Sequence, residues 1–68
     1  MGIEVIMKKS TSLVQAVDNV SLMLAEMRVD AEKADAGNKA ANVRVRKAAQ
    51  DIRNYLFAVR QLAMDKRD

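Results

Sequence analysis

The sequence predicts an all-α fold, an antiparallel helical hairpin (αα-hairpin) that dimerises into a four-helix bundle. Three observations predict it: apolar residues recur with alternating spacings of four and three in both halves, Pro is absent, and Gly37 is the only glycine beyond Gly2. The alternating spacing is typical of the a and d positions of packed helices. A single internal breaker indicates a single bend. The 68 residues therefore form one domain.

The first helix is expected at about residues 4–35. Its a and d positions are Leu13, Val17, Val20, Leu24, Met27, Ala31 and Ala34. This ladder can be extended back through Ile6 and Ile3. Alternatively, Ser12 and Gln15 fit a capping box, which would start the helix at Ser12.

The turn is expected at residues 36–38 and the second helix at about 39–66. Gly37 suits the left-handed position that closes a helix, and Asn38 suits the N-cap of the next one. Such a short bend forces the two helices to run antiparallel. The second ladder consists of Ala41, Val45, Ala48, Ile52, Tyr55, Val59 and Leu62.

Apolar residues exceed what one seam between two helices can bury. Those outside the ladders are Val14, Ala16, Leu22 and Met23 in the first half, and Val43, Ala49, Leu56, Phe57, Ala63 and Met64 in the second. Without Cys or His, a chain this short has no disulfide or zinc site to support its core. We therefore expect a homodimer or tetramer, with an interface at Leu24, Met27, Ile52, Leu56, Phe57 and Val59. Scattered surface hydrophobes, which are normal on proteins, are the alternative.

Charge is divided unevenly along the chain. Residues 1–36 carry six acids and four bases, a net of −2, whereas residues 37–68 carry eight bases and three acids, a net of +5. Five of these bases recur every seven positions and form what we call the basic row: Lys39, Arg46, Arg53, Arg60 and Arg67. On a helix they would lie in one line, about 10 Å apart. Arg44 and Lys47 lie near the start of this row in the sequence.

The basic row has two interpretations that the pattern does not separate. It can contact the phosphates of double-stranded DNA without reading sequence, for which the forked guanidinium of Arg is well suited. Alternatively it is a solvated face, or it pairs with carboxylates such as those of Asp18, Glu26 and Glu32 on neighbouring helices. The turn at Gly37, Asn38 and Lys39 likewise suits a phosphate, although simple helix capping explains the same residues.

Catalysis is not expected. The chain lacks the His or Cys of a nucleophile–base pair, and glycine-rich nucleotide-binding motifs need more glycines than it has. We expect no cofactor, no metal and no small-molecule substrate. The apolar run near the N-terminus is too short to span a bilayer or to serve as a secretion signal, so we expect a cytoplasmic protein with no membrane partner.

Residues 37–48, with the sequence GNKAANVRVRKA, resemble the bacterial histone H1-like family typified by the chlamydial Hc1 proteins. The turn GNKAA matches the family's turn, and Arg44-Val45-Arg46 matches its R-x-R core. The resemblance implies a nucleoid-associated protein that binds and compacts DNA non-specifically. Family members continue into a long Lys/Ala-rich tail, which this sequence does not contain. A dimer would double the net charge of +3 and set two basic rows on one assembly.

The sequence therefore favours non-specific binding of double-stranded DNA through phosphate contacts. The predicted contacts are Lys39, Arg44, Arg46, Lys47, Arg53 and Arg60, with Gly37 and Asn38 holding the start of the second helix. The alternative function is a protein–protein interaction module, a helical-hairpin oligomer whose arginines pair with acidic residues.

Overall fold

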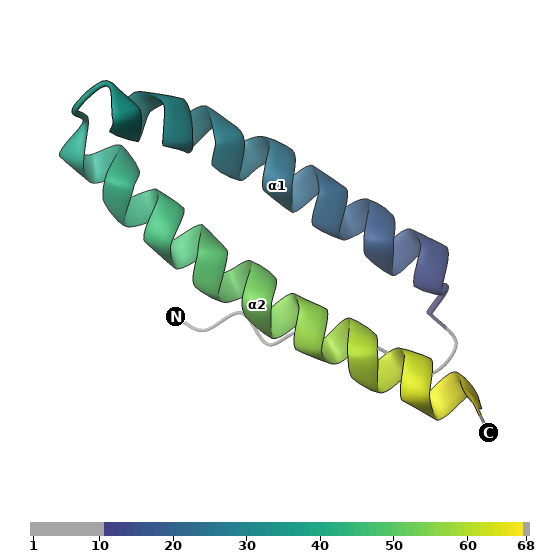
Figure 1. Cartoon of the computed structure of the whole chain (residues 1–68). Helices are drawn as coiled ribbons and strands as arrows, with labels where there is room; N and C mark the ends of the chain where they lie inside the picture. Colours follow the sequence, from purple (N-terminus) through teal and green to yellow (C-terminus); the bar gives the residue numbers. More distant parts are fainter. Residues whose placement is uncertain (1–10, 68) are drawn as a thin grey trace.

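The computed structural model describes residues 11–67, and side chains to residue 66. Two helices, α1 (Leu13–Asp35) and α2 (Lys39–Arg67), lie side by side and run in opposite directions (Figure 1). The molecule is an elongated, flat hairpin of 48 × 22 × 13 Å. The predicted all-α hairpin is thus confirmed for this part of the chain.

Helix α1 begins at Leu13 because Ser12 caps it. Ser12 is in an extended conformation, with φ −69° and ψ 134°, and its Oγ accepts a hydrogen bond of 3.3 Å from the backbone N–H of Gln15. A Ser at the N-cap satisfies one of the donors that a helix start leaves free. The structure thus has the later of the two expected starts. The extension through Ile6 and Ile3 lies outside the described residues.

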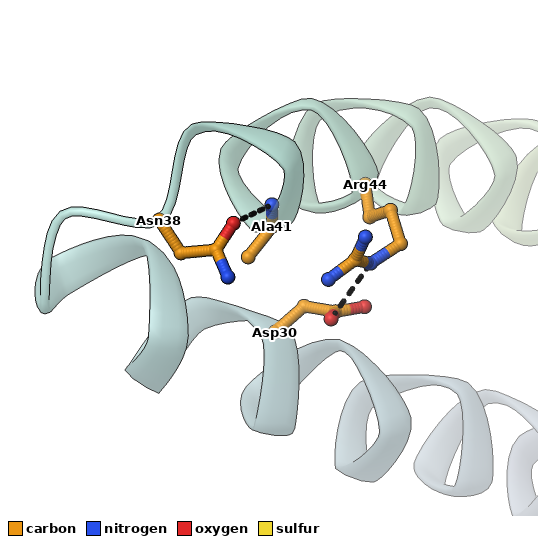
Figure 2. A network of polar contacts seen from close by, with 4 residues as sticks. All are labelled: Asp30, Asn38, Ala41 and Arg44. Atoms are coloured by element: carbon orange, nitrogen blue, oxygen red, sulfur yellow. Dashed lines mark hydrogen bonds and ion pairs between the residues drawn. The ribbon is translucent and has the colours of Figure 1, made fainter.

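The turn between the helices is a Schellman motif followed directly by an N-cap. The backbone N–H of Gly37 donates to the Ala34 carbonyl, and that of Asn38 donates to the Lys33 carbonyl, both at 3.0 Å. Gly37 has φ +101°, a conformation that side-chain-bearing residues avoid. Asn38 Oδ1 then accepts a 3.0 Å bond from the Ala41 N–H and starts α2 (Figure 2). Both predicted caps are confirmed.

The seam of α2 is the predicted one. Ala41, Ile52 and Leu62 are buried, and the other ladder positions, Val45, Ala48, Tyr55 and Val59, are half-buried. The heptad spacing of α2 therefore identified the main apolar residues that α2 packs against α1.

The seam of α1 differs from the prediction by a rotation of the helix. Ala16 is fully buried and Met23 is half-buried, whereas Val17 and Leu24 are exposed. The shared positions Leu13, Val20, Met27 and Ala34 do face α2, and these four and the predicted Ala31 are half-buried. Because apolar residues flank these shared positions on both sides, hydrophobic spacing alone did not determine which side packs.

Polar contacts between the helices explain the rotation. Asp30 Oδ1 and Arg44 Nε are 2.9 Å apart (Figure 2), and Asn19 Nδ2 donates to the Tyr55 hydroxyl at 2.9 Å. Both bonds require the Ala16, Met23 and Asp30 side of α1 to turn toward α2. Val17 and Leu24 are consequently left on the other side, in contact with solvent.

Candidate nucleic-acid interface

The basic row lies along the exposed surface of α2. Lys39, Arg46, Arg53 and Arg60 are all exposed, whereas the side chain of Arg67 lies outside the described residues. Each successive member is seven residues further along α2, which places neighbouring members about 10 Å apart. The structure thus brings the four described members into one line, as the spacing predicted.

These four side chains are turned away from α1. At about 100° per residue, the row lies roughly 130° around α2 from the seam formed by Ala41, Ile52 and Leu62. The ion pairs within 4.0 Å that involve described residues are Arg28–Glu32 and Asp30–Arg44, and neither includes a member of the row. The described row is therefore exposed, and none of its members pairs with a carboxylate of residues 11–66.

Arg44 is in a different environment from the row. Residues two apart on a helix point to opposite sides, so Arg44 projects away from Arg46 and toward α1. There its guanidinium pairs with Asp30, and the two side chains are 51% and 25% exposed. Part of its charge is offset by this carboxylate. Sequence reasoning missed Asp30, because its contact with Arg44 depends on the rotation of α1.

Lys47 is exposed but follows Arg46 directly, so it lies about 100° around α2 from the row. It adds to the positive potential of α2 without extending the line of arginines. The predicted contacts therefore divide into a linear set of four, an arginine engaged with α1, and a lysine on a separate flank.

The turn uses most of its polar groups for its own structure. The N–H groups of Gly37, Asn38 and Ala41 all donate within the chain, and the Asn38 side chain serves as the cap. These bonds favour the capping interpretation of the turn over a phosphate site.

The residues expected at an interface between copies lie in three environments. Leu24, Leu56 and Phe57 are exposed, Met27 and Val59 are half-buried in the seam, and Ile52 is buried between α1 and α2. A shallow groove of about 610 Å³ runs along α1 and is lined by Ser21, Leu24, Ala25, Met27, Arg28 and Ala31.

Other kinds of site are not formed by the described residues. Within residues 11–67 no cluster of three or more acidic side chains could hold a metal ion. Over the same range, neither helix has the long apolar stretch that a membrane crossing requires.

The family profile of the histone H1-like protein Hc1 matches residues 14–68, which is most of the chain, and the chain belongs to this family. Membership implies a DNA-binding, nucleoid-associated protein that is not an enzyme. No curated protein and no solved structure matches the chain.

Proposed function

We propose that this protein binds double-stranded DNA without sequence preference, and that Lys39, Arg46, Arg53 and Arg60 contact the phosphates. The observation that carries the proposal is the position of these four bases, which form an exposed line with no carboxylate partner among the described side chains in a chain of the histone H1-like family. Arg44 and Lys47 contribute positive potential beside this line.

The dimensions of the row suit a duplex. From Lys39 to Arg60 the row is about 30 Å long at 1.5 Å per residue. The same length of duplex holds about nine base pairs at 3.4 Å each. Contacts of this kind fix position on the phosphate backbone but carry no sequence information, so the affinity should be similar for duplexes of different sequence.

The test is fluorescence anisotropy with a short labelled duplex over a range of salt concentrations. For the unmodified chain, log affinity should fall linearly with log salt, with a slope of about −0.9 for each phosphate neutralised. Replacing Arg53→Gln together with Arg60→Gln should reduce the magnitude of this slope by about 2 and weaken binding for every sequence tested.

The matched control is Lys33→Gln together with Lys66→Gln, which removes the same charge from exposed positions outside the row. The control should keep the slope of the unmodified chain. Equal losses in both double variants would mean that net charge acts without a defined row. Absence of binding at low salt would reject the proposal.

We further propose that the chain acts as a dimer, in which two hairpins form a four-helix bundle. Support comes from the nine large apolar residues that the described part of the hairpin leaves exposed. Leu24, Leu56 and Phe57 are available for this contact, and Met27 and Val59 are accessible only at the edges of the seam. Ile52 would support the interface from inside the hairpin.

The second candidate function is a protein–protein interaction module. It is favoured by the Asp30–Arg44 pair, which shows that an arginine of α2 can be held by a carboxylate. If the row had this role, the variant with Arg53→Gln and Arg60→Gln would lose oligomer mass or thermal stability. A change in duplex binding alone, with mass and stability retained, excludes this candidate for the row.

A further inference from the structure

One side of the hairpin carries apolar residues from both helices, all of them exposed except the half-buried Ala31. We call it the shared apolar face, and it consists of Val17, Leu24 and Ala31 of α1 with Ala49, Leu56 and Ala63 of α2. Val17, Leu24 and Leu56 are 55%, 46% and 49% exposed. In both helices these residues recur every seven positions and directly follow residues that face the other helix, such as Ala16, Met23 and Leu62.

The antiparallel arrangement places these two stripes on the same side. Seen from its own N-terminus, each right-handed helix advances clockwise by about 100° per residue. Because α1 and α2 run in opposite directions, the residue after a seam position turns toward the same side of the hairpin in both. The bonds from Arg44 to Asp30 and from Asn19 to Tyr55 lie toward the opposite side.

The area of this face matches that of a protein–protein contact. Over the 23 residues of α1 it is about 35 Å long and two helices, or roughly 20 Å, wide. This corresponds to roughly 700 Å² per copy, near the ~800 Å² per partner of a standard interface.

We infer that a second copy covers the shared apolar face, with α1 of each copy lying against α2 of its partner. The two-fold axis then runs parallel to the helices. This inference rests on the proposed function and specifies how two hairpins pair and where their basic rows lie.

Charge selects this pairing over the other closed arrangement, in which α1 lies on α1 and α2 on α2. In that arrangement the two basic rows, which border the shared apolar face on α2, would meet along one edge of the bundle, so that only like charges would oppose each other. In the inferred pairing each row lies beside Val14, Ser21, Arg28 and Asp35 of the partner's α1, where one positive and one negative charge cancel. Asp18 and Glu32, next around the same helix, add two negative charges.

The consequence is an assembly with two basic rows on opposite edges of one four-helix bundle. Each edge presents its own line of Lys39, Arg46, Arg53 and Arg60, so one dimer contacts two separate duplexes. In the other arrangement both rows would serve a single duplex.

The absence of Cys from the chain allows a direct test by disulfide formation. Asp30 lies level with Arg44, and Asn19 lies level with Tyr55. Because the helices are antiparallel, each residue forward along α1 corresponds to one residue backward along α2. Leu24 therefore lies level with Gln50, which is next to Ala49. Variants Leu24→Cys and Ala49→Cys are prepared as separate full-length chains. They are oxidised mildly either alone or after being mixed, unfolded and refolded together. Both positions are exposed, and circular dichroism verifies that each variant remains helical.

We expect a disulfide-linked dimer in the mixed sample and in neither single-variant sample. Disulfides within the Leu24→Cys sample or within the Ala49→Cys sample would show α1 on α1 or α2 on α2 and would overturn the inference. Absence of any disulfide would overturn it as well. Duplex binding is measured on the same samples. Binding without the mixed disulfide rejects only the pairing, whereas the mixed disulfide without binding rejects only the proposed function.

Discussion

Asn38 connects the two helices through its backbone and its side chain. Its N–H completes the end of α1 by donating to the Lys33 carbonyl, and its Oδ1 starts α2 by accepting from the Ala41 N–H. Replacing an N-cap Asn by Ala costs about 1 kcal/mol. Asn38→Ala should therefore lower the free energy of unfolding by about that amount, measured by urea unfolding at fixed protein concentration.

Asn38→Asp is the matched control, because its carboxylate oxygen can accept the same bond and is favoured at a helix N-terminus. It should retain the stability of the unmodified chain. If Asn38→Ala were as stable as Asn38→Asp, the cap would contribute nothing, and the turn would depend on Gly37 and its Schellman bonds alone. Both cap residues were predictable from the sequence because their chemistry is local.

At the scale of helices, the sequence determined α2 more completely than α1. The ladder of α2 has polar or small neighbours at most positions, so one face is clearly the most apolar. In α1 the pairs Ala16-Val17 and Met23-Leu24 are apolar on both sides of the shared positions. The side that packs is determined by bonds to Arg44 and Tyr55. Those contacts are distant in sequence, so the spacing of apolar residues in α1 could not reveal them.

The observed rotation of α1 predicts how the helix responds to larger side chains. Ala16 is fully buried against α2, so Ala16→Leu should overpack the seam and destabilise the fold by about 1–3 kcal/mol. The same substitution at the exposed Ala25 should change stability by less than about 0.5 kcal/mol. Thermal and urea unfolding at one protein concentration measure both. Equal effects would favour the rotation in which Val17 and Leu24 pack against α2.

At the scale of the whole molecule, the hairpin has a thin core. Ala16, Ala41, Ile52 and Leu62 are its buried apolar residues within the described range, and two of them are alanines. Composition and length predict further burial between copies, because the apolar residues outnumber the positions in one seam. The sequence alone did not identify the shared apolar face, since its position depends on how α1 is rotated.

Two leucines on opposite sides of α1 provide a matched test of self-association. Leu24 lies on the shared apolar face, whereas Leu22, 61% exposed, lies two residues away and points elsewhere. Leu24→Asp should place a charge inside the dimer contact, where an unpaired carboxylate is strongly unfavourable, and should yield a monomer in analytical ultracentrifugation at tens of micromolar. Leu22→Asp should remain a dimer. A dimer in both variants would place the contact on another surface, such as the outer stripe of α2 at Val43, Phe57 and Met64. A monomer for the unmodified chain would exclude the bundle.

The monomeric Leu24→Asp variant should still bind a duplex through its single row, with a similar salt slope per bound duplex. It should no longer hold two duplexes together. Capture of a fluorescent duplex by an immobilised one measures that loss.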